Sequence, residues 1–168
     1  MKKFLLFCVI GAMAFLIGYY VDDQYGAWRS PVQPINFSHK IHAGDNKIPC
    51  MYCHVYADRS RVASVPNEQR CMGCHKIIKT ESPLIQKLTS YWDKKEPIPW
   101  VKVHNLPDYV YFPHKRHIRA GLDCKLCHGN VPAMARIRRV APLQMGWCIN
   151  CHDSHKVKNG RDCWTCHQ

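Results

Sequence analysis

The sequence contains five copies of one short pattern, C-x-x-C-H, whose residues could hold a redox cofactor. The copies are CMYCH at 50–54, CMGCH at 71–75, CKLCH at 124–128, CINCH at 148–152 and CWTCH at 163–167. In this pattern the two thiols can form thioether bonds to the vinyl groups of a haem, and the adjacent histidine can bind the iron from one face. The sequence therefore predicts five covalently bound haem c groups.

Each residue of the pattern has a predicted role. The predicted haem tethers are Cys50, Cys53, Cys71, Cys74, Cys124, Cys127, Cys148, Cys151, Cys163 and Cys166, and the predicted first iron ligands are His54, His75, His128, His152 and His167. Zinc sites and disulfides also use paired cysteines. Neither explains a histidine after every pair, which chance would give about once in a million in a chain with 11 histidines among 168 residues.

Six histidines outside the pattern are candidates for the second iron ligands. They are His39, His42, His104, His114, His117 and His155. The segments FSHKIH and FPHKRH each contain two of them three residues apart, so on a helical turn their rings diverge by roughly 60 degrees and can serve two different haems. His104 and His155 compete for the fifth place. Met145 could replace a histidine there, although packing against a ring is the simpler use of that side chain.

An internal repeat must position these groups. INFSHKIHAGDNKIPCMYCH at 35–54 and VYFPHKRHIRAGLDCKLCH at 110–128 share the order Phe, His, His, Gly, C-x-x-C-H, and a second motif follows each copy. The repeat predicts a di-haem module at 35–79 and another at 108–153. A connecting segment at 80–107 joins the modules, and a fifth-haem segment at 154–168 follows the second one.

The connecting segment contains the clearest local signals of secondary structure. Ser82 is a predicted cap and Pro83 a predicted first residue of a short helix. This helix would present one apolar face made of Leu84, Ile85, Leu88 and Trp92. The following residues, 96–112, are rich in proline and are expected to be extended.

The N-terminal segment predicts a membrane anchor. Lys2 and Lys3 precede 18 uncharged, mostly apolar residues at 4–21, about 27 Å of helix, which is just enough to cross a bilayer core. We therefore expect a transmembrane anchor at 1–22 and a polar tether at 23–34, with the N-terminus cytoplasmic and the haem domain on the periplasmic side of a bacterial inner membrane. A cleaved signal peptide is the alternative, and Cys8 is expected to face lipid.

The fold class follows from these elements: one transmembrane helix and a small, mostly irregular multihaem cytochrome c domain with short helices. Five haems in about 147 residues must be near neighbours and supply much of the core. The formal net charge of +12 first suggests a nucleic-acid partner. Haem propionates account for much of this charge, and no nucleic-acid-binding module is present, so we expect no nucleic acid.

The motifs resemble the class III multihaem cytochromes c, and most closely the pentahaem cytochrome subunit of alternative complex III. The similar stretches are PINFSHKIHAG with CMYCH, ASVPNEQRCMGCHK, WVKVHNLPDYVYFPHKRH with CKLCHGNV, and APLQMGWCINCH. The resemblance implies a complex that oxidises menaquinol. It also implies an iron–sulfur subunit, polytopic membrane subunits of a respiratory or photosynthetic complex, and a periplasmic carrier such as a monohaem cytochrome c or copper protein. It favours His104 over His155 as the fifth second ligand.

The expected function is therefore electron relay, with no catalytic residue in this chain. A subunit of a quinone reductase complex uses similar motifs with electrons moving in the opposite direction, and it is the first alternative. A stand-alone quinol dehydrogenase and a multihaem reductase with one open iron are two further alternatives.

Overall fold

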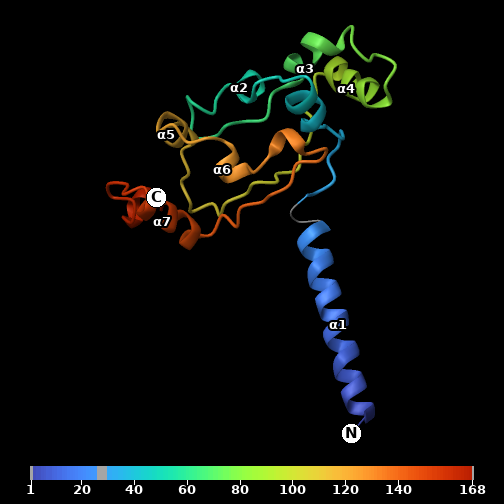
Figure 1. The fold of residues 1–168 in the computed structure, drawn as a ribbon. Coiled ribbons are helices and arrows are strands. Elements are labelled where there is room, and N and C mark those ends of the chain that lie inside the picture. Colours follow the sequence, from blue (N-terminus) through green and yellow to red (C-terminus); the bar gives the residue numbers. More distant parts are fainter. Residues whose placement is uncertain (1, 26–29, 168) are drawn as a thin grey trace.

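The structure is a computed structural model that describes residues 2–25 and 30–167 and, within the first helix, the side chains of residues 4 and 7–21. Figure 1 shows a long helix standing away from a body of short helices and long connecting segments. The helices are α1 (Lys2–Tyr25), the π-helix η1 (Lys40–Asp45), α2 (Cys50–Cys53), α3 (Glu68–His75), α4 (Pro83–Lys94), α5 (His114–Arg119), α6 (Lys125–His128), the 3₁₀ helix η2 (Val131–Ala133), α7 (Met145–Ser154) and α8 (Cys163–Cys166).

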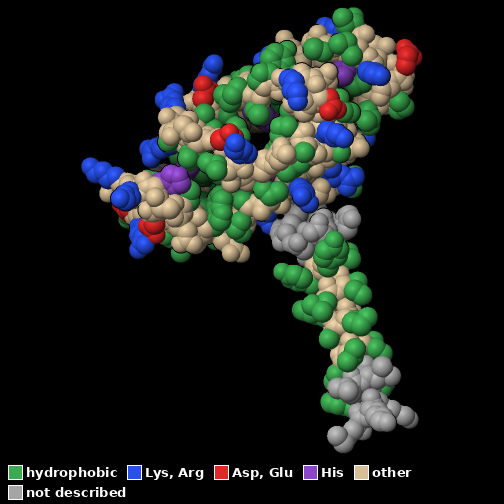
Figure 2. All heavy atoms as spheres, viewed as in Figure 1, with side chains coloured by type: hydrophobic (Ala, Val, Ile, Leu, Met, Phe, Trp, Pro, Cys, Tyr) green, Lys and Arg blue, Asp and Glu red, His purple; other side chains and the backbone are tan. Residues whose placement is uncertain are grey.

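Helix α1 presents apolar side chains to its surroundings along its described length (Figure 2). Phe7 and Phe15 are among the most exposed, and Cys8 is exposed as well. Among the described residues we find no helix whose length and apolar character together suffice to span a bilayer. The predicted anchor at 1–22 is thus not confirmed, and parts of it and of the tether at 23–34 lie outside the described residues. The helix itself continues to Tyr25, three residues past the predicted end of the anchor.

The protein core of the body is small and lies between the first module and the connecting segment. Ile35, Met72, Leu88 and Ile98 form its buried cluster. Helix α4 begins after Ser82 with Pro83 in its first turn, as predicted. The predicted apolar face needs one correction, because Leu84 is 40% exposed while Leu88 is buried. Ile85 and Trp92 pack against the cluster that contains Leu88. Leu84 is also one turn from Leu88, but it lies at the exposed edge of the packed face.

The two repeats pack against each other in a reciprocal way. In the first repeat, the amide of Lys40 at the start of η1 donates to the carbonyl of Met134, just after the first motif of the second repeat (2.9 Å). In the second repeat, the amides of His114 and Lys115 in α5 donate to the carbonyls of Arg61 and Ser60, just after the first motif of the first repeat (3.0 and 3.1 Å). Each histidine-bearing helix is therefore held by the other module.

The connecting segment and the C-terminal motif meet at the edge of the second module. Residues 96–112 are extended or irregular, as predicted, and contain an isolated antiparallel bridge between Val110 and His167. The amide of Tyr111 also donates to the carbonyl of Cys166 (2.6 Å). The fifth motif is thus attached to the strand-like segment that leads into α5.

Candidate haem-binding site

The five C-x-x-C-H motifs are all built on short helical turns, in α2, α3, α6, α7 and α8. All the described cysteines are free thiols, so none of them forms a disulfide. In the described part of the chain, no group of three or more His, Cys, Asp or Glu side chains is arranged to hold a metal ion by itself. The two alternative uses of paired cysteines therefore gain no support from the geometry.

Four of the five motif histidines orient their rings by the same kind of hydrogen bond. A backbone carbonyl cannot donate, so Nδ1 in each of these rings must carry the proton, and Nε2 keeps the lone pair that can bind iron. The four Nδ1–H groups donate as follows: His54 to Ser64 O (2.7 Å), His75 to Ile78 O (3.0 Å), His152 to Gly160 O (2.8 Å) and His167 to Tyr109 O (3.2 Å). These acceptors were not predicted, because any residue type supplies a carbonyl.

Most histidines outside the motifs also donate a hydrogen bond from Nδ1 to a backbone carbonyl. The Nδ1–H groups donate from His42 to Ser38 O (2.8 Å), from His114 to Arg61 O (3.0 Å), from His117 to Pro113 O (3.0 Å) and from His155 to Cys151 O (3.0 Å). Their Nε2 atoms are again left with lone pairs for a metal. His39 differs, because its Nδ1 is buried without a hydrogen-bond partner.

Three pairs of rings are spaced as two axial ligands of one iron should be. Two imidazoles that bind one metal from opposite sides, each with a bond of about 2.0 Å, place their ring centroids roughly 6 Å apart. The centroids lie 6.0 Å apart for His42 and His75, 6.1 Å for His117 and His152, and 6.4 Å for His114 and His128. The residues present therefore fit the predicted group at these three motifs.

A phenylalanine supports each pair of histidines in the same geometry. Phe37 lies 4.9 Å from the ring of His39, edge-on at 87°, and 4.4 Å from that of His42, at 24°. Phe112 lies 4.8 Å from the ring of His114 at 87° and 4.3 Å from that of His117 at 32°. The two rings of each pair therefore have different orientations, as the three-residue spacing predicts.

Burial keeps two of the candidate ligands neutral. The pKa of His39 is lowered to about 4, mainly by burial and to a smaller extent by the nearby His54 and His42. Burial also lowers the pKa of His104 to about 4, with His128 as the next cause. At neutral pH both imidazoles are uncharged and can use a lone pair. His39 therefore has the protonation state expected of an iron ligand.

The structure places neither predicted candidate for the fifth second ligand against His167. The ring of His104 packs edge-on against His128, with centroids 4.4 Å apart. His155 is exposed at the C-terminal end of α7. Among the described rings, Tyr109 lies against His167 (5.8 Å, 30°). Met145 is 66% exposed at the start of α7 and does not pack into the body.

The motif cysteines show which motifs are neighbours. Burial raises the pKa of the Cys71 thiol and the nearby Cys53 raises it further, which links the second and first motifs. Burial also raises the pKa of the Cys124 thiol in the third motif, and the nearby Cys50 of the first motif raises it further. Burial raises the pKa of the Cys127 thiol, and the nearby Cys151 of the fourth motif raises it further. Burial also raises the pKa of the Cys148 thiol, and the nearby Cys166 of the fifth motif raises it further. The spatial order is thus second, first, third, fourth, fifth, which Figure 1 shows as α3, α2, α6 and α7 across the body.

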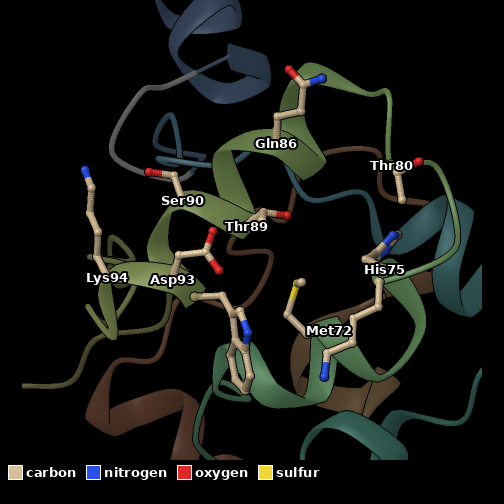
Figure 3. Close-up of a pocket in the computed structure, with 10 residues that line it drawn as sticks. Met72, His75, Thr80, Gln86, Thr89, Ser90, Asp93 and Lys94 are labelled. Atoms are coloured by element: carbon tan, nitrogen blue, oxygen red, sulfur yellow. The ribbon is translucent and has the colours of Figure 1, made fainter.

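A cavity of about 690 Å³ lies beside the second motif, between α3 and α4 (Figure 3). Met72 and His75 line it from α3, and Thr89 and Asp93 line it from α4. Lys76, which follows α3, and Lys94, at the end of α4, are also among its lining residues, so cations for propionate groups lie near an imidazole.

Two comparisons with known proteins match this chain. Residues 110–168 match the family described as "Cytochrome c7 and related cytochrome c". The chain is also 25% identical over 194 aligned positions to the "Menaquinone reductase, multiheme cytochrome c subunit" of Nitratidesulfovibrio vulgaris (strain Hildenborough), and the alignment covers 94% of this chain and 90% of that protein. The family match includes the second histidine pair and the last three motifs.

Proposed function

We propose that this chain, a multihaem c-type cytochrome related to cytochrome c7 with multiple covalent haems, is the electron-transferring subunit of a menaquinone reductase complex. The alignment with the menaquinone reductase subunit carries the proposal, because it extends over nearly the full length of both chains. It favours a quinone reductase over the quinol-oxidising alternative complex III that the motifs first suggested. The two roles differ in the direction of electron flow, towards the quinone in the proposed one.

The proposed haem sites are formed by ten cysteines and pairs of histidines from different elements. Each bound haem supplies one-electron ferric–ferrous chemistry. The ring separations support His42 with His75, His117 with His152, and His114 with His128 as ligand pairs. His39 is the proposed second ligand at the first motif, because its Nδ1 is buried without a hydrogen-bond partner and its neighbour His42 is already paired with His75. The chain thus holds five groups, four of them with two histidines of its own.

The order of the motifs in space gives the proposed relay two ends. The second motif lies at one end, beside α4 and the cavity, and the fifth motif lies at the other, beside Tyr109. Motifs that are neighbours in space allow electrons to pass between them without a substrate site in the chain. The proposed contacts with an electron donor and with the remainder of the complex are therefore made at these two ends.

The proposed partners and location follow from the same role. They are an iron–sulfur subunit, polytopic membrane subunits and a periplasmic electron carrier, at the periplasmic face of a bacterial cytoplasmic membrane. The exposed apolar side chains of α1 support attachment to an apolar environment in that assembly. Lysine and arginine side chains are distributed over the body (Figure 2), which supports contacts with haem propionates and with an acidic carrier.

The test is the direction of electron transfer in the complex purified with mild detergent. We expect the chain to co-purify with its partner subunits and, once reduced by a periplasmic cytochrome, to become oxidised when a soluble menaquinone analogue is added. Two haem equivalents should be oxidised for each quinone, because the quinone takes up two electrons and two protons. Haem stain and mass spectrometry of the same sample should show five haems. The variant C163A/C166A should show four.

Two outcomes would contradict the proposal. Haems that the quinol analogue reduces rapidly, but the quinone analogue does not oxidise, would support the alternative complex III role. A purified chain without partner subunits that exchanges electrons with the quinone on its own would support a stand-alone quinol dehydrogenase instead.

A further inference from the structure

His104 occupies a place that no other histidine outside the motifs has. Its Nε2 lies 3.2 Å from Nδ1 of the motif histidine His128, and the two rings meet edge-on at 80°. A centroid separation of 4.4 Å is too short for two ligands on opposite sides of one iron, which requires roughly 6 Å. His128 already has a ring at that separation, His114, whose plane is within 8° of its own.

We propose that His104 is a positioning residue: it accepts the Nδ1–H hydrogen bond of His128 and is not itself an iron ligand. The inference rests on the proposed haem at the third motif, but it concerns a residue for which the proposed function has no role. His104 is the acceptor that replaces the backbone carbonyl found at the other four motifs.

The proton positions in this pair are determined by the ligand role of His128. If Nε2 of His128 binds iron, its Nδ1 must carry the proton and donate it, so Nε2 of His104 must be the acceptor. A proton-free Nε2 in turn requires the neutral form of His104 with its proton on Nδ1. The two rings are partly buried, which limits the access of water as a competing acceptor.

An imidazole acceptor has two consequences that a carbonyl acceptor does not. An imidazole nitrogen is the more basic acceptor, so it draws the Nδ1 proton further, increases the basicity of His128 and stabilises the ferric iron. The perpendicular contact also holds the ring plane of His128 in its nearly parallel relation to His114. We therefore expect the third haem to have a lower potential than it would have with a carbonyl acceptor.

The test compares three variants of the full-length, haem-loaded chain by EPR and by potentiometric titration. H104A should keep the number of low-spin haems of the wild type and raise the potential of one haem. A tenfold change in its ferric–ferrous equilibrium corresponds to 59 mV for one electron. H104Q restores a side-chain acceptor of similar reach and should return the potential towards the wild-type value. The control H114A removes the proposed ligand and should convert one haem to high spin.

A new high-spin signal in H104A would show that His104 is an axial ligand and would overturn the proposal. A low-spin H104A with unchanged potentials and g-values would overturn it as well, because the hydrogen bond would then have no effect on the haem. Haem content measured on each sample separates misfolding from these results. A failure of the menaquinone reductase role would leave this test intact, since it uses only the purified chain.

Discussion

The two repeats of this protein agree in the surroundings of the second histidine of each pair and differ in the surroundings of the first. The ring centroid of the second histidine of each pair, His42 or His117, lies 6.0 or 6.1 Å from that of the last motif histidine of its own module. Its Nδ1–H group donates to the carbonyl of the residue four positions earlier. In each repeat the phenylalanine meets the first histidine ring of the pair edge-on and lies at a smaller angle to the second, with nearly the same distances in both repeats. Where all partners belong to one module, the repeats keep the ring separations and the hydrogen-bond acceptors. The angle between the two rings differs, at 67° for His42 and His75 and 26° for His117 and His152.

The first histidine of each pair lies at the contact between the modules, and there the repeats differ. His114 donates to Arg61 of the other module, whereas Nδ1 of His39 has no hydrogen-bond partner. His54 donates to a carbonyl, whereas His128 meets His104. The supporting helix also differs, because η1 is a π-helix and α5 an α-helix. Partners from different parts of the chain therefore allow two copies of one motif to acquire different environments.

The largest effect is expected when the second histidine of either pair, a proposed iron ligand, is removed. H42A and H117A should each convert one low-spin haem to high spin, because each removes one ring of a pair spaced for bis-histidine ligation. EPR and cyanide binding measure the change, which should be of equal size in the two variants. A change in only one of them would show that the two modules ligate their second haem differently.

A smaller effect is expected from the protein core, which the first module forms with the connecting segment. L88A should lower the free energy of unfolding by about 2–4 kcal/mol, because Leu88 is buried in the cluster with Met72. Urea titration followed by circular dichroism measures this change. The matched control in the second module is L126A, whose side chain is exposed and should change stability by less than about 0.5 kcal/mol. Equal losses would contradict a core confined to the first module and the connecting segment.

The smallest effect is expected at the glycine that follows each histidine pair. A Cβ on Gly44 would overlap the carbonyl oxygen of Pro132 in the other module, so G44A must separate the two backbones at a loss of about 1–3 kcal/mol. Gly121 has open space around it and a φ of +81°, so G121A meets only the left-handed backbone penalty of about 1 kcal/mol. Thermal unfolding should therefore show the larger decrease for G44A, and the reverse order would contradict close packing between the modules.

The sequence predicted the local features of the fold and of the site well. The helix that begins after Ser82, the extended residues 96–112 and the different orientations of the paired rings depend on a few neighbouring residues. Leu84 was wrongly placed on the buried face, since a helical repeat predicts the direction of a face but not how wide the packed part is. The proposed ligand pairs and the position of His104 could not be predicted, because residues up to 35 positions apart must meet there.

The sequence by itself determined the class of cofactor and its number of attachment sites, because thioether formation and iron ligation require two cysteines and a histidine within five residues. The covalent chemistry is local, and so is its signature. Only the tertiary structure decided the spatial order of the motifs, the acceptors that orient each imidazole and the place of His104. These depend on backbone carbonyls and on contacts between two modules, which side-chain identity along the chain does not encode.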